Sequence, residues 1–212
     1  MAAKVRDNGA CQAPAAGQLS SIPLGSTGRL PGAVSRYFRW AQKEHPLRTR
    51  IAATLPAGPV FLILLPLVVV AGGRSLDRLF ALEGFHLGAP NYVFSGLLVI
   101  VGFFFGFWSI LVQFTRGRGT PLPMMPTQQL LTNGPFRYCR NPMTFGTILA
   151  YAGIGVLAGT IAGIGLALCF AALLVLYLKR NEERELAERF GEPYLEYKRQ
   201  VPFIIPRPPK RQ

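Results

Sequence analysis

Acidic side chains are scarce in this chain: 10 Asp and Glu stand against 23 Lys and Arg in 212 residues, a formal net charge of +13. Charged residues make up only 16% of the sequence, whereas soluble domains have about 25%. Scarce charge combined with 15 Phe excludes an extended disordered protein, because such chains are polar and poor in aromatic residues. A basic surplus is typical of nucleic-acid-binding domains, so the positions of the charges decide what it means.

Cysteine is also scarce. Cys11, Cys139 and Cys169 follow no recognisable spacing, so the sequence predicts neither a disulfide framework nor a metal site. We interpret all three as small packing residues. An apolar core of about 7 to 15 residues is missing near the start, so no secretory signal is expected.

Long apolar runs dominate what is present, and half of the residues are hydrophobic. Between Ile51 and Leu178 the few charged residues all lie between such runs, as the ~30 Å hydrocarbon core of a bilayer requires. We therefore expect an all-α integral membrane bundle of about four transmembrane helices with cytoplasmic C-terminal helices. The first two spans are expected within 51–114, at about 52–72 and 92–114, and 143–178 is expected to form a helical hairpin that turns at Gly159 and Thr160.

The remaining segments are expected to flank this bundle. Residues 1–33 are rich in Ala, Gly, Ser and Pro without apolar periodicity, which predicts a disordered tail. Residues 34–50 carry an apolar stripe and basic residues, which predicts an interfacial amphipathic helix. Residues 115–212 form the core in which chemistry is expected: a polar loop, the hairpin and the C-terminal helices.

The basic residues indicate the topology. Eight of them precede the first span, four lie in 115–141 and nine follow Leu178. Arg74 and Arg78 remain, in the one loop assigned to the other side. By the positive-inside rule this predicts a multi-pass protein with both termini in the cytoplasm, in the endoplasmic reticulum of a eukaryote or the inner membrane of a bacterium. The basic residues therefore mark the membrane surface, and no nucleic-acid partner is expected.

The first polar segment of interest, 133–142, opens the third span. Pro142 suits the first turn of a helix, and the free backbone donors of a helix N-terminus favour a carboxylate or other anion. Alternatively, Arg137 and Arg140 serve only as topology anchors and Tyr138 only as an interfacial aromatic residue.

The second polar segment, 179–197, follows the fourth span and holds six of the ten acidic residues. Glu185 and Arg189 form a helix-supporting pair, Gly191 is a plausible helix end, and Pro193 can start a new helix that carries Tyr194 and Tyr197. A solvated charged helix explains the segment without any ligand. The functional interpretation is that its carboxylates bind an amine-bearing cofactor while arginines hold a carboxylate.

These two segments resemble a known family. The run GPFRYCRNPM at 134–143, followed about forty residues later by EERELAERFGEPYLEYKRQV at 182–201 and a proline-rich end, is similar to the isoprenylcysteine carboxyl methyltransferases. The wider group includes membrane phospholipid N-methyltransferases. The resemblance covers about 121–206, and the paired motifs around a helical hairpin make it fairly specific.

The resemblance implies a membrane enzyme that uses S-adenosyl-L-methionine to methylate a lipidic or prenylated acceptor, which enters sideways between helices. Glu182 would neutralise the cofactor's amino group, and polar atoms near Asn141 would receive its carboxylate. By position, the family's cofactor contacts fall on Gln128, Gln129, Leu130, Leu131, Phe136, Asn141, Pro142, Met143, Thr144 and Glu182.

Several positions depart from the family pattern, and they bear on the acceptor. A His is usual at Asn141, and Tyr is common at Phe136 and Thr144. Leu178 stands where eukaryotic members carry an arginine for the acceptor carboxylate, so Lys179 or Arg180 would have to replace it, and we place Arg180 in the site. An amine acceptor needs a base, for which Glu183 or Glu185 is a candidate.

The resemblance implies that the acceptor is a carboxylate of the isoprenylcysteine type. A phospholipid or other lipid amine is the alternative. Two other functions stay open. Membrane sterol reductases that use NADPH share a related C-terminal plan, and a small membrane scaffold without activity would also fit the departures.

Overall fold

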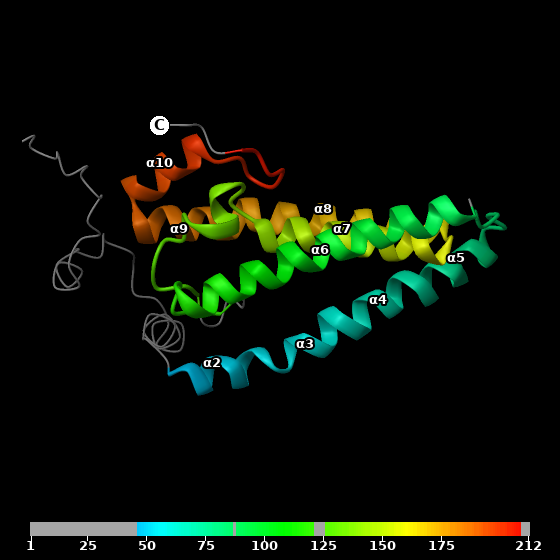
Figure 1. Ribbon diagram of the computed structural model, residues 1–212, viewed down its shortest axis with the longest axis horizontal. Coiled ribbons are helices and arrows are strands. Elements are labelled where there is room, and N and C mark those ends of the chain that lie inside the picture. The colour runs from blue at the N-terminus through cyan, green and yellow to red at the C-terminus, as the bar shows by residue number, and fades with distance from the viewer. Residues whose placement is uncertain (1–45, 87, 121–125, 209–212) are drawn as a thin grey trace, which may run out of the picture. The chain divides into compact units, whose positions relative to one another are not determined.

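Every regular element in residues 46–86, 88–120 and 126–208, the part described by the computed structural model, is helical (Figure 1). The predicted all-α membrane bundle is thereby confirmed. The tail 1–33 and most of the interfacial helix predicted at 34–50 lie outside the described residues. The helices are α2 (Leu47–Thr54), α3 (Ala57–Pro59), α4 (Leu65–Leu67), α5 (Gly73–Leu79), α6 (Ala89–Thr115), α7 (Pro142–Ala158), α8 (Ile161–Tyr177), α9 (Glu183–Phe190) and α10 (Glu192–Gln200), with π-helical turns at Val60–Leu64, Val68–Gly72 and Leu178–Glu182 and a 3-10 turn at Gly134–Arg137.

Three helical segments in the described part of the chain are long and apolar enough to cross a membrane: Leu47–Leu79, Ala89–Thr115 and Ile161–Phe190. A fourth apolar helix, α7, has only 17 residues. At 1.5 Å per residue it reaches about 25 Å, somewhat less than the hydrocarbon thickness of about 30 Å. Charged residues begin at Lys179, so we take 161–178 as the membrane-spanning part of the last segment.

The first span is longer than predicted and is not a regular α-helix. Pro56, Pro59 and Pro66 lie within it, and the two π-helical turns at Val60–Leu64 and Val68–Gly72 follow Pro59 and Pro66. Proline removes a backbone donor and pushes away the preceding turn. Membrane helices tolerate this because local π-helical adjustment satisfies the freed carbonyls.

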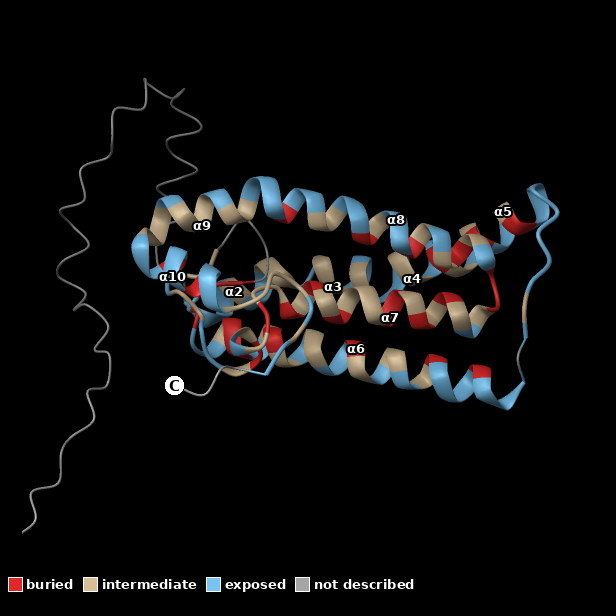
Figure 2. Cartoon of the chain, turned by 90° about the horizontal axis from the view of Figure 1, so that it is seen from above, coloured by how far each residue is buried: buried red, intermediate tan, exposed pale blue. Residues whose placement is uncertain are grey.

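Helix α7 lies between α6 and α8 and packs against both (Figure 2). Glycines set this packing, as small residues do between membrane helices. A Cβ atom on Gly102 of α6 would stand 2.6 Å from the carbonyl oxygen of Gly146 in α7, and one on Gly153 would stand 2.9 Å from the side chain of Leu98. Gly165 of α8 differs, because nothing lies within 4 Å of its Cβ position.

The hairpin turn lies at the predicted Gly159 and Thr160. Gly159 ends α7 with φ +65° in the left-handed region, and the Thr160 hydroxyl begins α8 by accepting a hydrogen bond from the Gly163 amide at 2.6 Å. These are the usual stop and start signals of helices. They split an apolar run of nearly two membrane crossings into two antiparallel helices.

Replacing Gly159 with alanine is expected to lower the free energy of unfolding by at least about 1–2 kcal/mol, the cost of left-handed backbone for a residue with a Cβ. The added atom would also lie 2.6 Å from the carbonyl oxygen of Phe85. Thermal unfolding of the purified protein in detergent measures the change. The matched control is Gly165→Ala, which should be neutral or slightly stabilising, and equal effects of both substitutions would contradict the prediction.

Candidate functional site

The start of α7 is held against the C-terminal end of the chain. Pro142 is buried in the first turn of α7, as predicted. Just before it, the amide of Arg140 donates to the carbonyl of Pro202 at 2.9 Å, and the amide of Asn141 donates to that of Phe203 at 3.1 Å. The side chain of Asn141 donates to the same Phe203 carbonyl at 3.2 Å. Segment 202–203 therefore covers the entrance of α7.

Helices α9 and α10 complete this end of the bundle. Gly191 separates them with φ +60°, and Pro193 lies in the first turn of α10, as predicted. The predicted ion pair between Glu185 and Arg189 is present at 3.3 Å. On α10, Tyr194 and Tyr197 are buried. This helix is therefore packed against the rest of the protein and is not fully solvated.

Tyr197 ties α10 to the turn before α7. Its hydroxyl donates to the carbonyl of Phe136 at 2.6 Å. Burial raises the pKa of Tyr197, so the hydroxyl keeps its proton and remains a donor at neutral pH. The contact fixes the 3-10 turn 134–137 against α10.

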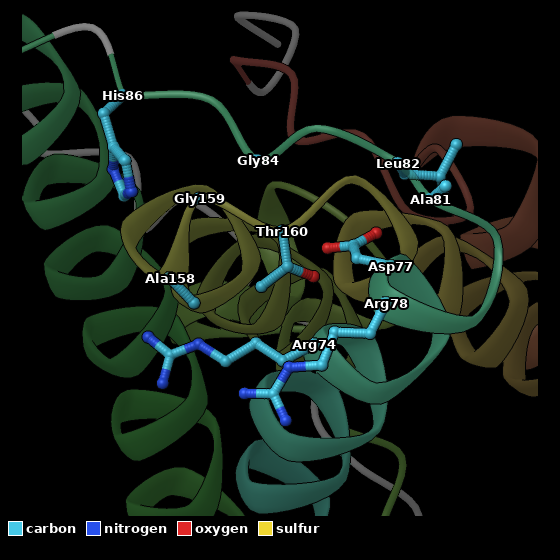
Figure 3. A pocket seen from close by; sticks show the side chains of 10 residues that line it. All are labelled: Arg74, Asp77, Arg78, Ala81, Leu82, Gly84, His86, Ala158, Gly159 and Thr160. Carbon is cyan, nitrogen blue, oxygen red and sulfur yellow. The ribbon is translucent and has the colours of Figure 1, made fainter.

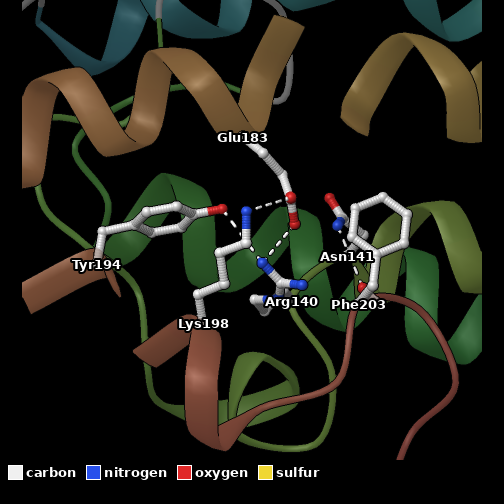
Figure 4. A network of polar contacts seen from close by, with 6 residues as sticks. All are labelled: Arg140, Asn141, Glu183, Tyr194, Lys198 and Phe203. Atoms are coloured by element: carbon white, nitrogen blue, oxygen red, sulfur yellow. Dashed lines mark hydrogen bonds and ion pairs between the residues drawn. The ribbon is translucent and has the colours of Figure 1, made fainter. Parts of the chain in front are cut away.

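A network of charged side chains lies between α7, α9 and α10 (Figure 4). Glu183 of α9 forms ion pairs with Arg140 and, at 2.8 Å, with the Nζ atom of Lys198. Arg140 also donates to the Tyr194 hydroxyl at 3.4 Å. The side chains of Arg140 and Glu183 are only 10% and 12% exposed. Two cations thus surround one carboxylate, and the network has a net positive charge.

Arg140 retains an unused donor in this network. Its Nε atom is buried and has no hydrogen-bond partner among the described residues. Its guanidinium group and the Lys179 ammonium group lie 5.5 and 5.2 Å from the centre of the Phe203 ring. A buried donor without a partner is costly, so this corner is suited to an anionic ligand.

Glu182 lies next to this network, below the membrane-spanning part of α8. The side chain is partly buried and forms no hydrogen bond or ion pair with the described residues. Burial, and then the negative charges of Glu185 and Glu183, raise the pKa of Glu182 to about 7. A cation bound beside Glu182 would favour the charged form of its carboxylate.

The loop before α7 also reaches this end. The amide of Gln128 donates to the carbonyl of Gly117 at 2.7 Å, and Arg189 of α9 donates to the carbonyl of Thr127 at 2.8 Å. Gly119 lets the loop approach, because its Cβ would come within 2.7 Å of the carbonyl carbon of Pro126. The loop is thus anchored between the end of α6 and α9 at Thr127 and at Gln128, the first of the predicted residues 128–131.

The structure brings some of the predicted site residues together and leaves others outside the network. Phe136, Asn141 and Glu183 belong to the contacts described above, whereas Arg180 is exposed and makes no polar contact with the described residues. Met143 is partly buried and Thr144 is buried in the first turns of α7. The sequence did not predict the roles of Arg140, Tyr194, Lys198 and Phe203, although Pro193 indicated the start of the helix that carries Tyr194 and Tyr197.

The cysteines agree only in part with a packing role. Cys139 is fully buried beside the network, and burial raises the pKa of its thiol to about 11, so the reactive thiolate is suppressed. Cys169 is exposed on α8, which corrects its interpretation as a packing residue. Cys11 lies outside the described residues.

The fold and the site define a helical membrane protein with a charged site at one end of an apolar hairpin. Residues 90–193 match the model of the phospholipid methyltransferase family. The match begins in α6 and ends in α10, so it includes the hairpin, the whole of the first polar segment and most of the second. It confirms the resemblance to the membrane methyltransferase group, which includes the isoprenylcysteine carboxyl methyltransferases.

One curated relative is the cobalt-zinc-cadmium resistance protein CzcN of Cupriavidus metallidurans. It is 37% identical over 79 residues, which are 37% of this chain and 36% of the relative. The match thus spans about a third of that protein's length. In the described part of this chain, no group of three or more His, Cys, Asp or Glu side chains could hold a metal ion.

Proposed function

We propose that this protein is an integral-membrane methyltransferase that uses S-adenosyl-L-methionine and acts on a lipidic acceptor. The family match over 90–193 supports a membrane methyltransferase. The observation that carries the cofactor assignment is the pairing of an unpartnered carboxylate, Glu182, with a neighbouring net positive cluster that includes the free Nε of Arg140. The methionine end of the cofactor carries one ammonium and one carboxylate group, which complement these two charges.

The cofactor supplies an activated methyl group when bound, so the chain needs to align the acceptor and exclude water. Glu182 would bind the ammonium group and Arg140 the carboxylate. The family resemblance placed Asn141 at this carboxylate. In the structure, its backbone amide and its side-chain amide both donate to the carbonyl of Phe203. We assign it instead to holding segment 202–203 over the site, where Phe203 would limit access of water.

For the acceptor, we propose first a carboxylate of the isoprenylcysteine type. Such an acceptor needs no base, and the positive network would attract it. Lys179, whose ammonium group lies over Phe203, is better placed to serve this carboxylate than Arg180, which makes no polar contact with the described residues.

A lipid amine is the second candidate. It is favoured by Leu178, which is buried and apolar where an arginine for the carboxylate would be expected, and by the phospholipid methyltransferase match. The base for this reaction would be Glu183 or Glu185. Glu183 would first have to leave its two ion pairs, with Arg140 and Lys198.

For location, we propose a multi-pass protein of the endoplasmic reticulum or the bacterial inner membrane with both termini in the cytoplasm. The support is the position of the Lys and Arg residues, nearly all of which lie before the first span, in 115–141 or after Leu178, the segments expected on one side of the membrane. This arrangement would place the charged site on the cytoplasmic surface of the membrane.

The test is a methyl-transfer assay with the full-length protein, cofactor labelled on its methyl group and a total membrane extract. Base-labile label on prenylated protein or peptide is expected for a carboxyl acceptor, and stable label in the phospholipid fraction for an amine. A variant carrying Glu182→Gln provides the background. The proposal is wrong if neither fraction gains label above that background.

A further inference from the structure

The opposite end of the bundle holds a second polar feature, the hairpin-end pocket (Figure 3). It has a volume of about 460 Å³ and lies where α5 meets the turn between α7 and α8. Its polar lining comes mainly from Arg74, Asp77, Arg78, His86 and Thr160. It does not belong to the site around Glu182.

The positive charges of the two arginines are not neutralised by any described residue. They are one helical turn apart on α5, and Figure 3 shows their side chains extending in the same direction. Neither forms an ion pair or hydrogen bond with the described residues, and both are exposed. They are also the two basic residues between Ile51 and Thr115. All the positive charge of this stretch therefore gathers at the pocket.

The acidic residue between them is already used. Asp77 is buried, and its Oδ1 atom accepts a hydrogen bond from the amide of Ala162 at 2.9 Å. It thus caps the N-terminus of α8 and favours that positive helix end. One engaged carboxylate against two guanidinium groups leaves the pocket with a net positive charge.

The backbone at the hairpin turn and the Thr160 hydroxyl are engaged in internal hydrogen bonds. The amide of Phe85 donates to the carbonyl of Gly159 at 3.1 Å, and the Thr160 hydroxyl accepts from Gly163. Arg74 and Arg78 supply most of the donors that remain available, and the imidazole of His86 also lines the pocket. Guanidinium groups match the oxygens of a phosphate in pairs, so the shape and charge select a phosphate-bearing anion.

The surroundings indicate where this phosphate comes from. Leu79 and Phe80, directly after the arginines, are 74% and 66% exposed. Large apolar side chains exposed at the end of a membrane span are stable when they contact lipid. A phosphate at the level of Arg74 and Arg78 is then at the depth of lipid headgroups.

We propose that the hairpin-end pocket binds the phosphate of an anionic phospholipid through Arg74 and Arg78. The headgroup is anionic and not zwitterionic, because Asp77 is occupied and the described residues that line the pocket include no second carboxylate to pair with an amine. The bound lipid would link the first span to the hairpin. This site is independent of the proposed methyl transfer.

Native mass spectrometry of the full-length protein tests this, after reconstitution in nanodiscs of phosphatidylcholine with phosphatidylglycerol and release into detergent. Phosphatidylglycerol is expected to remain bound to the wild type. The double variant Arg74→Gln/Arg78→Gln should lose about tenfold of this retention, the effect of one charge-assisted contact or more. The control Arg184→Gln/Arg199→Gln removes the same charge from exposed side chains at the other end and should retain the lipid.

Two further arms decide the remaining outcomes. The variant Arg74→Lys/Arg78→Lys keeps the charge but not the paired geometry, and intermediate retention is expected; this variant replaces the glutamine form if the latter does not fold. Displacement of the lipid by millimolar inorganic phosphate would assign the pocket to free phosphate and overturn the lipid assignment. Equal retention by the wild type and both pocket variants would overturn the site.

Discussion

Replacing Glu182 with glutamine is expected to weaken binding of S-adenosylhomocysteine by about 100-fold, the effect of losing one partner of a desolvated charge pair. The substitution keeps the size of the side chain and removes its charge, so the ammonium group of the ligand would be buried without a counterion. Isothermal titration of the purified protein in detergent or nanodiscs measures the affinity.

The raised pKa of Glu182 indicates how binding of the ligand depends on pH. The pKa of Glu182 is raised to about 7 in the free protein, and the ligand's ammonium group binds the deprotonated form. Binding should therefore tighten as the pH rises toward 7, and each unit below that value should cost up to about tenfold in affinity. Titrations between pH 5.5 and 7.5, roughly the range of this change, should show the slope in the wild type and lose it in Glu182→Gln.

The matched control for Glu182 is Glu188→Gln on the next helix. Glu188 is 67% exposed and pairs with the exposed Arg184, so its loss should leave affinity and pH slope unchanged. Full binding by Glu182→Gln would remove the cofactor role of this residue. If the wild type binds no S-adenosylhomocysteine in several detergents and in nanodiscs, the scaffold interpretation replaces the enzyme.

The second large effect is expected from Arg140→Gln, which should lower the free energy of unfolding by about 2–3 kcal/mol. Removing one member of a buried ion pair leaves the other uncompensated, which costs several kcal/mol, and here Lys198 continues to pair with Glu183 and reduces that cost. The start of α7 would lose its link to α9. Thermal or denaturant-induced unfolding in detergent measures the change.

The exposed pair between Arg184 and Glu188 gives the comparison. These side chains are 80% and 67% exposed, so Arg184→Gln should cost less than about 0.5 kcal/mol. The double variant Arg140→Gln/Glu183→Gln should lose less stability than the sum of the two single variants, because both substitutions remove the same ion pair. Equal losses from Arg140→Gln and Arg184→Gln would show that burial adds nothing to the Arg140 pair.

The elements that the sequence predicted are those with local causes. The turn at Gly159, the first turn of α7 at Pro142, the break at Gly191 and the pair Glu185–Arg189 all follow from residues within one or two helical turns. The number of spans was less predictable, because α7, which was expected as the third span, stops after 17 residues. The π-helical turns of the first span were also not predicted, since they depend on how each helix accommodates its prolines.

The candidate site divides in the same way. Glu182 could be selected from its place in a motif, and nothing in the sequence around it shows that it has no partner. Glu183, the next residue, was given a role in chemistry, whereas the fold surrounds it with Arg140 and Lys198. One position along a helix rotates a side chain by about 100°, so only the packing decides which carboxylate is paired and which is free.

By itself, the sequence determined a helical membrane protein with polar segments on either side of a hairpin, because apolar runs, glycines and prolines act locally. Its two polar motifs also showed a resemblance to the membrane methyltransferases. The tertiary structure decided how charges far apart in the chain meet. Arg140 reaches Glu183 and Tyr194, and the side chain of Asn141 donates a hydrogen bond to the carbonyl of Phe203. Desolvation makes these contacts strong, and it arises only when α7, α9, α10 and the C-terminal segment come together.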